Sequence, residues 1–351
     1  PEFAATSPRS QQPSMRSSER FGTLDVKSPA VKSYRSYLTE TQDLTASKIR
    51  MVAPRAEIKR RFNIALNGMT MTLSQQEAAK VADLPGVKVV SRAKEYKLFT
   101  DVGPKHIGAD MVWQGSGVPD GVEMRGEGIV AGIIDTGINS DHPSFAAVAG
   151  DGYVHTNPLG KGEFVGDCVE YPNMCNSKLI GVRSYDIITD TFKDPVFQPD
   201  IPEWEADYKR APNGEDYNGH GSHTAGTVAG NVLHDVAFQL AGMTEKSDGF
   251  DTPLVFPEIS GVAPRANIIA YQVCYPGGGS FGETYGGCPG DALVAAIEDA
   301  IVDGVDVINF SIGGLESLPW YDAIEMAFLS AREAGISVAA SAGNWGQYGP
   351  S

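Results

Sequence analysis

The pattern of apolar and polar positions changes along the chain, and its later part alternates short aliphatic runs with amphipathic stretches. The aliphatic runs predict buried strands at residues 129–134, 268–273, 305–310 and 336–340. The stretches at residues 291–302 and 321–334 have apolar residues on one helical face and predict helices. Strands that alternate with helices indicate an α/β fold, with a parallel sheet covered by helices on both faces.

The N-terminal part has a different pattern. Residues 1–30 are rich in Ser, Pro, Arg and Gln without hydrophobic periodicity, which is typical of a disordered leader. We expect residues 31–100 to form a small, ferredoxin-like α+β domain and residues 101–351 to belong to a second domain. The elements expected in the small domain are a strand at 31–38, a helix at 57–62, a turn at Asn67-Gly68, a helix from the capping box at Ser74 to Val81, and a strand at 87–90.

Composition narrows the function classes. The chain has 351 residues, of which 42% are hydrophobic, so it is long enough to bury a large core. A net charge of −16 and a pI near 4.8 argue against nucleic acid and anionic membranes as partners. No apolar run approaches the roughly 20 residues that span a bilayer.

Four cysteines lie in Gly-, Pro- and Asn-rich segments. Four cysteines allow three pairings, and sequence alone does not choose among them. The short separations favour two local loops, Cys168–Cys175 and Cys274–Cys288. Four free thiols in a cytosolic protein are the alternative, whereas in an exported protein such exposed thiols would be oxidised.

Two groups of residues have side chains suited to catalysis, one at the end of a predicted strand and one later in the chain. Asp135 comes directly after the strand at 129–134, and Gly137 then permits a sharp turn. His220 and His223 lie among Gly, Ser, Thr and Ala residues, which suits a tightly packed helix that begins with an exposed imidazole. An Asp in a turn and a structural His are the ordinary interpretations of either feature alone. Ligands of parallel sheets bind beyond the carboxyl ends of the strands, so residues at these positions are candidates for catalysis.

Two further clusters follow strands. The first contains Ser311, Ile312, Gly313 and Gly314, whose open backbone groups favour pairing with an extended peptide. The second contains Ala342, Gly343 and Asn344, and the Asn side chain can donate a hydrogen bond to a developing oxyanion. A tight turn and an Asn in a left-handed turn are the structural alternatives.

The four clusters in this order resemble the motifs of the subtilisin-like serine peptidases, or subtilases. The segments at 261–264 and 303–309 strengthen the resemblance, which covers residue 100 to the end and is greatest to the plant and related bacterial secreted branch. It implies His220 as general base and later acid, Asp135 as the residue that orients it, and Asn344 as the oxyanion donor. Ser311, Ile312, Gly313, Gly314, Ala342 and Gly343 would bind substrate.

The resemblance also implies an inhibitory propeptide. Residues 31–100 resemble the family's propeptide, which would be cleaved near Thr100–Asp101 and would act as an intramolecular inhibitor. The implied protein is a secreted, extracellular endopeptidase that acts on proteins or peptides; no metal site is assigned, although structural calcium is possible, with Asp141 as one candidate ligand. The family's Gly-Thr-Ser nucleophile motif does not follow Asn344, so we expect this chain to be inactive without the missing C-terminal half of the catalytic domain.

Two other functions remain open at this stage. A metallohydrolase would use His220 and His223, but zinc peptidases space their histidines at i and i+4 with a Glu between them. A catalytically dead subtilase-like module that grips peptides would not need Asp135, His220 and Asn344 together. Metal analysis tests the first alternative, and the encoded sequence beyond Ser351 tests the second.

Overall fold

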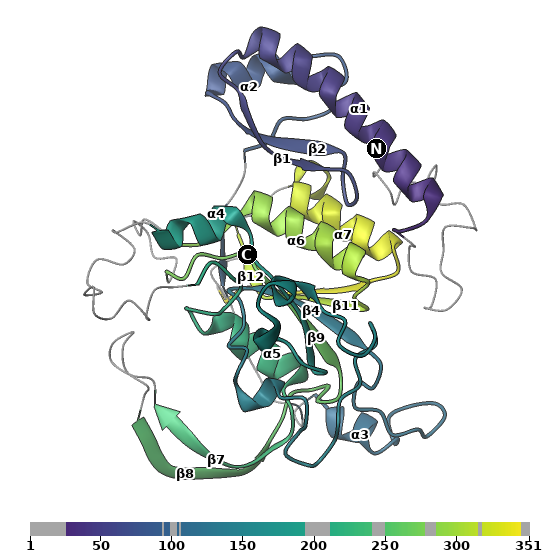
Figure 1. Ribbon diagram of the computed structural model, residues 1–351, viewed down its shortest axis with the longest axis vertical. Helices are drawn as coiled ribbons and strands as arrows, with labels where there is room; N and C mark the ends of the chain where they lie inside the picture. The colour runs from purple at the N-terminus through teal and green to yellow at the C-terminus, as the bar shows by residue number, and fades with distance from the viewer. Residues whose placement is uncertain are drawn as a thin grey trace. The chain divides into compact units, whose positions relative to one another are not determined.

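Contacts within the chain group its residues into two units in the computed structural model (Figure 1). Unit 1 comprises Pro1–Phe99, Tyr185–Phe197 and Val273–Ser351, and unit 2 comprises Thr100–Ser184 and Gln198–Gln272. The structure describes residues 26–92, 95–98, 104, 107–193, 211–240, 250–277, 286–314 and 318–344. No helix in this described part is long and apolar enough to cross a membrane.

Unit 2 is built on parallel strands in the order β4-β9-β6-β5. Its elements are α3 (Ala109–Trp113), β4 (Val130–Asp135), η2 (Pro143–Phe145), β5 (Val165–Gly166), η3 (Asp167–Val169), η4 (Pro172–Met174), β6 (Leu179–Arg183), α5 (His220–Ala229), β7 (Leu233–Leu240), β8 (Phe250–Ile259) and β9 (Asn267–Gln272). Every residue of β4 and β9 is buried, as expected for central parallel strands.

Helix α5 packs on β4 and β9 through its small residues. Ala225 and Ala229 are fully buried, four residues apart on one face, and contribute to the same core as Ile133 and Ile268. Strands β7 and β8 pair as an antiparallel hairpin, which the sequence pattern did not predict. This packing fixes the start of α5 close to the end of β4.

Unit 1 begins with a long helix instead of the expected strand at 31–38. Its elements are α1 (Pro29–Val52), β1 (Glu57–Phe62), β2 (Gly68–Thr72), α2 (Gln75–Ala82), β3 (Glu95–Leu98), α4 (Asp186–Thr189), η5 (Asp190–Lys193), β10 (Cys288–Pro289), α6 (Gly290–Asp303), β11 (Val307–Phe310), β12 (Ile312–Gly313), η7 (Pro319–Tyr321), α7 (Ala323–Glu333) and β13 (Ser337–Ala340). Ser28 caps α1 by accepting a hydrogen bond from the Val31 backbone N–H, and Pro29 occupies its first turn.

Three further expectations for the small α+β part of unit 1 are corrected. Residues 57–62 form strand β1, not a helix, because they pair in an antiparallel ladder with β2. The turn lies at 63–67, since Phe62 pairs with Gly68. Residues 87–90 form no strand; Val87 and Val90 pack against the small apolar cluster around Ile49 instead. The capping box at Ser74 and the helix after it are confirmed.

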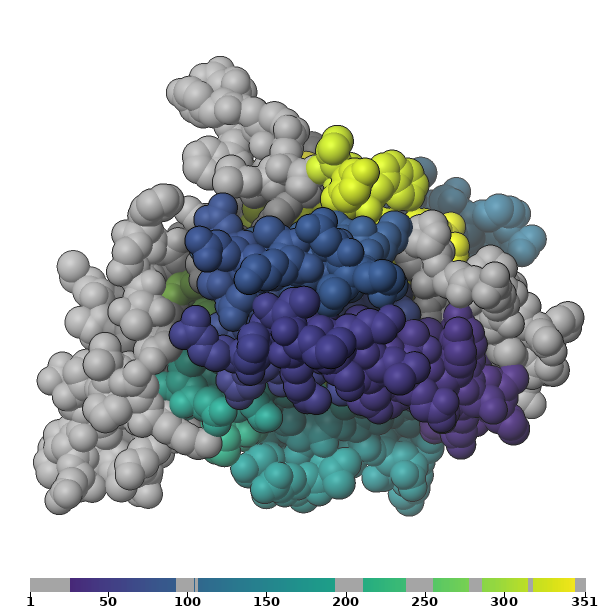
Figure 2. Space-filling model, turned by 90° about the horizontal axis from the view of Figure 1, so that it is seen from above, coloured from purple at the N-terminus to yellow at the C-terminus, as the bar shows by residue number. Residues whose placement is uncertain are grey.

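The expected leader also ends earlier than residue 30. Val26 is buried and α1 begins at Pro29, whereas residues 1–25 lie outside the described part of the chain. Figure 2 shows α1, in purple, across one face of this unit, beside the blue segment that contains β1, β2 and α2. Residues 29 and 30, assigned to the leader from the sequence, are therefore part of α1.

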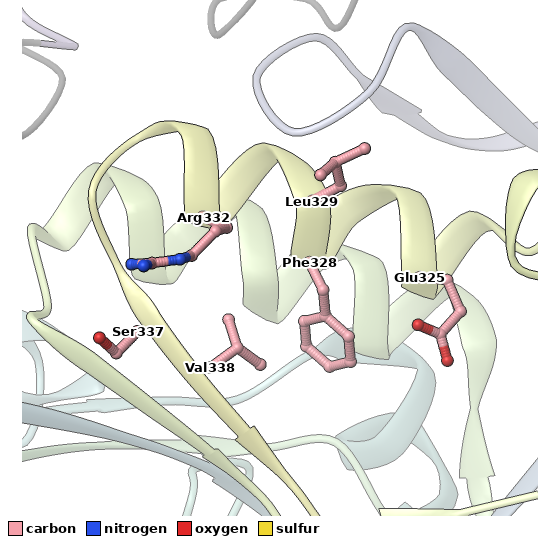
Figure 3. Close-up of a pocket in the computed structure, with 6 residues that line it drawn as sticks. All are labelled: Glu325, Phe328, Leu329, Arg332, Ser337 and Val338. Carbon is pink, nitrogen blue, oxygen red and sulfur yellow. The ribbon is translucent and has the colours of Figure 1, made fainter.

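The remaining predicted elements are confirmed, with small differences at their ends: β4, β9, α6, β11, α7 and β13. Strand β13 pairs in parallel with β11 and has no strand on its other side among the described residues. Its contact with α7 leaves an open hollow of about 550 Å³ lined by Phe328, Leu329 and Val338, with Glu325, Arg332 and Ser337 at its edges (Figure 3).

Candidate active site

Asp135 is the last residue of β4, at the carboxyl edge of the unit 2 strands. Its side chain is fully buried. The Oδ1 atom accepts a hydrogen bond from the Thr136 backbone N–H at 2.8 Å, and the Thr224 hydroxyl lies 3.1 Å from Oδ2. These partners hold the carboxyl group in one orientation.

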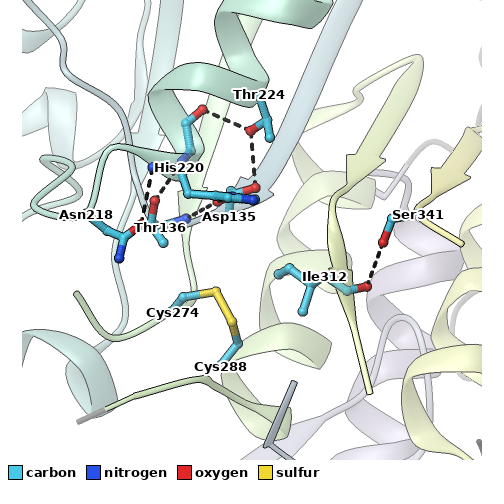
Figure 4. Close-up of a disulfide and its surroundings, with 10 residues drawn as sticks. Asp135, Thr136, Asn218, His220, Thr224, Cys274, Cys288, Ile312 and Ser341 are labelled. Carbon is cyan, nitrogen blue, oxygen red and sulfur yellow. Dashed lines mark hydrogen bonds and ion pairs between the residues drawn. A yellow bond between two sulfur atoms is a disulfide. The ribbon is translucent and has the colours of Figure 1, made fainter. Parts of the chain in front are cut away.

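His220 is the first residue of α5, and its ring meets Asp135 (Figure 4). Nδ1 lies 2.7 Å from Asp135 Oδ1, and the side chain is 14% exposed. Because the carboxylate accepts, Nδ1 carries the proton, and Nε2 is then the basic nitrogen of the neutral ring. Residues that are 85 positions apart in the sequence thus form a carboxylate–imidazole pair.

Two glycines allow the strand end and the helix start to approach. Gly137 has φ 116°, a conformation that favours glycine. A Cβ at Gly221 would lie 2.3 Å from the Gly137 carbonyl oxygen. The Gly221 N–H donates to the Thr136 hydroxyl at 2.7 Å, so the two segments are also joined by a hydrogen bond.

Burial is the main electrostatic influence on this pair. It raises the pKa of the Asp135 carboxyl above its ordinary value, while the hydrogen bond and charge of His220 act in the opposite direction. A carboxylate without surrounding water interacts strongly with an imidazolium beside it. Asp135 is therefore suited to stabilise His220 when the ring accepts a second proton.

The expected substrate-binding segment lies in unit 1. Ile312 and Gly313 form β12, which pairs antiparallel with β3: Ile312 is opposite Leu98, and Gly313 is opposite Lys97. On its other side β3 pairs with β10. The chain's own residues 95–98 thus lie as an added strand between two short strands, as an extended peptide would.

The segment that contains the expected oxyanion donor follows β13 in the same unit. Ala342 and Asn344 are exposed, and Gly343 has φ 77°. The preceding Ser341 approaches β12, with its hydroxyl 3.4 Å from the Ile312 carbonyl oxygen (Figure 4). The convergence of these unit 1 segments with Asp135 and His220 stays a prediction, as do the roles of Ser311, Gly314 and Asn344.

The N-terminal part of unit 1, residues 26–92 and called the small N-terminal unit below, is joined to α6 and α7 by hydrogen bonds that the sequence did not indicate. Glu298 of α6 accepts hydrogen bonds from the backbone N–H groups of Ile64, at 2.8 Å, and Ala65, at 2.9 Å. The fully buried Ser330 hydroxyl of α7 donates to the Ala65 carbonyl oxygen. The loop between β1 and β2 is therefore held by polar groups of two helices.

The cysteines form two disulfides, Cys168–Cys175 and Cys274–Cys288, with the pairing that their spacing favours. His223 is exposed, and no three His, Cys, Asp or Glu side chains in the described part of the chain form a metal-binding group. Thr100 and Asp101, the expected cleavage position, lie outside the described residues. Asp141 is exposed, and calcium binding stays a prediction.

Comparison with known proteins identifies the class. The profile of the subtilase family matches residues 126–350, and the profile of peptidase inhibitor I9 matches residues 17–99. Since the first match covers more than half of the sequence, the chain belongs to the subtilase family. The predicted α/β fold, with a parallel sheet, helices and an inhibitory propeptide unit, is thereby confirmed.

The relatives are considerably longer than this chain. Subtilisin-like protease SBT2.6 of Arabidopsis thaliana is 31% identical over 338 residues, which are 93% of this chain and 36% of the relative. SBT2.4 of the same plant is 33% identical over 300 residues, which are 81% of this chain and 31% of the relative. The chain thus spans about a third of the length of the curated relatives it matches.

Two solved structures resemble the chain less closely. Fervidolysin of Fervidobacterium pennivorans, a keratinolytic enzyme, has 18% identity and a TM-score of 0.44, covering 86% of this chain and 38% of that chain. The epidermin leader peptide processing protease of Staphylococcus aureus has 15% identity and a TM-score of 0.44. This match covers 87% of the present chain and 57% of that protease chain.

Proposed function

We propose that this chain supplies the general base and its orienting carboxylate to a secreted serine endopeptidase that is made as an autoinhibited proenzyme. The observation that carries the proposal is the 2.7 Å contact between His220 Nδ1 and the fully buried Asp135 carboxylate. Family membership and the two disulfides support an exported peptidase.

The chemistry follows from the protonation of the pair. With the proton on Nδ1 directed at Asp135, Nε2 takes the proton of a serine hydroxyl as that oxygen attacks the peptide carbonyl. The imidazolium then gives the proton to the leaving amine, and the resulting acyl-enzyme is hydrolysed by water through the same steps. Asn344 would donate a hydrogen bond to the oxyanion.

No Gly-Thr-Ser motif, which carries the nucleophile in the family that the chain resembles, lies between Asn344 and Ser351. We therefore assign the base and its carboxylate to this chain and assign no nucleophile. The substrate class is an extended protein or peptide segment, because β12 and β10 pair with a strand and not with a compact ligand.

Residues 95–98 support autoinhibition. They occupy the strand position between β10 and β12 that we assign to the substrate, so the N-terminal unit would block the cleft until it is removed. Cleavage near Thr100–Asp101 would release the enzyme.

A polypeptide that continues residues 1–351 through a subtilase Gly-Thr-Ser segment, the extended protein, tests the proposal. We expect hydrolysis of an unfolded protein that a sulfonyl fluoride abolishes and that His220→Ala removes. The extended protein with the serine of that segment replaced by alanine is the inactive control. Peptide binding without hydrolysis would identify a non-catalytic binding module, and hydrolysis that resists the sulfonyl fluoride but stops with a metal chelator would identify a metallohydrolase.

A further inference from the structure

A second carboxylate lies beside the Asp135–His220 pair, in the turn that precedes α5. Asp216 Oδ1 accepts hydrogen bonds from the backbone N–H groups of Asn218, at 3.0 Å, and Gly219, at 2.9 Å. Its Oδ2 accepts from the Ser222 backbone N–H at 2.8 Å and from the Ser222 hydroxyl at 2.6 Å. The four donors lie on both sides of His220 in the sequence, so this carboxylate closes the turn that carries the imidazole.

The same residue is attached to the segment that carries Asp135. The Asp216 backbone N–H donates to the Ile138 carbonyl oxygen at 3.2 Å, and the Ile138 N–H donates to Gly214 at 3.1 Å. Ile138 is three residues beyond Asp135 and fully buried. A shift of Asp216 relative to β4 would therefore break backbone hydrogen bonds in a buried place.

Ser222 completes a closed ring of contacts. Its hydroxyl donates to Asp216 and accepts a hydrogen bond from the Asn139 backbone N–H at 2.8 Å. The ring runs from the Ile138 carbonyl through Asp216 and Ser222 to Asn139, the next residue after Ile138. It joins the loop after β4 to the first turn of α5 independently of the contact between His220 and Asp135 themselves.

We propose that Asp216 and Ser222 are positioning residues, which together form a bracket that holds the His220 ring at hydrogen-bonding distance from Asp135. The carboxylate fixes the backbone of the turn, and the serine hydroxyl fixes the turn to the strand loop. Proton transfer depends on this placement, because a displacement of about 1 Å can cost a factor of about 100 in rate.

Ser222 and Thr227 provide matched variants for the test. Ser222→Ala removes the shared hydroxyl, Ser222→Thr keeps it, and Asp216→Asn replaces one acceptor oxygen by a donor. Thr227→Ala is the control, because the Thr227 hydroxyl lies on the same helix and donates to the His223 carbonyl oxygen, one turn earlier in that helix. The kinetic part of the test rests on the proposed function.

In the extended enzyme, we expect Ser222→Ala to lower kcat about 10- to 100-fold with little change in KM, and Ser222→Thr to restore it. In residues 1–351 alone, NMR should show that the His220 Nδ1 proton exchanges with solvent at least about tenfold faster in Ser222→Ala and Asp216→Asn than in the wild type or Thr227→Ala. Wild-type exchange rates in both variants would overturn the inference. If the extended protein cleaves nothing, the proposed function fails, and the proton exchange still decides the role of the bracket.

Discussion

The Glu298 carboxylate should be the main polar anchor between α6 and the small N-terminal unit. It is 9% exposed, and the N–H groups that it binds belong to Ile64 and Ala65, which are 4% and 0% exposed. Glu298→Ala leaves both N–H groups buried without that acceptor, and each unsatisfied donor costs about 1–3 kcal/mol of folding free energy. Part of this loss is offset because the variant no longer buries a carboxyl group, so we expect a net loss of about 2–4 kcal/mol.

Glu298→Gln distinguishes the hydrogen-bond acceptor of this side chain from its charge. The amide keeps a carbonyl oxygen for the two N–H groups, so its stability at neutral pH should be within about 1 kcal/mol of the wild type. Burial raises the pKa of Glu298 from 4.5 to about 7. The folded chain therefore binds more protons than the unfolded chain between these values, and this group's contribution to stability falls as the pH rises from 4.5 to 7. The glutamine variant should lack that decline, which is at most on the order of 3 kcal/mol.

Hydrogen exchange of the β1–β2 segment measures the anchor directly. A loss of 2 kcal/mol corresponds to roughly 30-fold faster exchange of amides 57–72 through local opening. Glu333→Ala, an exposed acidic position on α7, is the matched control. Protection of this segment in Glu298→Ala within about threefold of the wild type would refute the assignment of Glu298 as an anchor.

Three further predictions concern the catalytic pair and the core of unit 2. In the extended enzyme, Asp135→Asn should lower kcat about 10⁴-fold, the magnitude known for the equivalent change in a Ser-His-Asp triad; a loss below tenfold in steady-state kinetics would contradict the role of Asp135. Gly221→Ala should cost about 1–3 kcal/mol in urea unfolding because its Cβ meets the Gly137 carbonyl, and an unchanged midpoint would disprove the close packing. Lys178 is fully buried and donates to the Pro264 and Ala266 carbonyl oxygens, and burial lowers its pKa from 10.5 to about 7. Between pH 7 and 10.5 the folded state therefore binds fewer protons than the unfolded state, so the contribution of Lys178 to stability rises with pH in this range. Lys178→Met should abolish that rise. The same pH dependence of stability in the variant and the wild type would contradict the lowered pKa of Lys178.

Much of the parallel-strand architecture was predictable because its signals are local. The run before Asp135 is continuous and aliphatic, as a strand buried on both faces requires, and it becomes β4. The small residues around His220 indicated a tightly packed helix, and a Cβ at Gly221 would lie 2.3 Å from the Gly137 carbonyl oxygen. Recognition of the family depended on the order of such segments along the chain.

The errors in the N-terminal unit have specific causes. The segment at 31–38 was interpreted as a strand, although its apolar and aromatic residues recur every three to four positions. The buried positions Val31, Leu38 and Ala46 continue that helical period. Ser28 and Pro29 were a usable start signal for that helix that the sequence interpretation missed. At 57–62 the charges suggested a helix, whereas the pairing with β2 decides the structure.

Contacts between distant residues could not be inferred from local pattern. Glu298 and Ile64 are separated by 234 positions, and nothing near Glu298 distinguishes it from an ordinary acidic residue of an amphipathic helix. Asp216 is close to His220 in sequence, yet its role becomes visible only when the loop after β4 lies against it. Such side chains acquire their function from the packing of elements, which the sequence pattern specifies only coarsely.

Asp135 holds the proton-bearing Nδ1 atom of His220, and proton NMR of residues 1–351 tests this contact without any need for the nucleophile. One His220 N–H resonance should lie far downfield of ordinary imidazole protons and should be absent from both Asp135→Asn and His220→Gln. A spectrum of the folded wild-type chain without this resonance, or its persistence in Asp135→Asn, would show that Asp135 does not hold the Nδ1 proton.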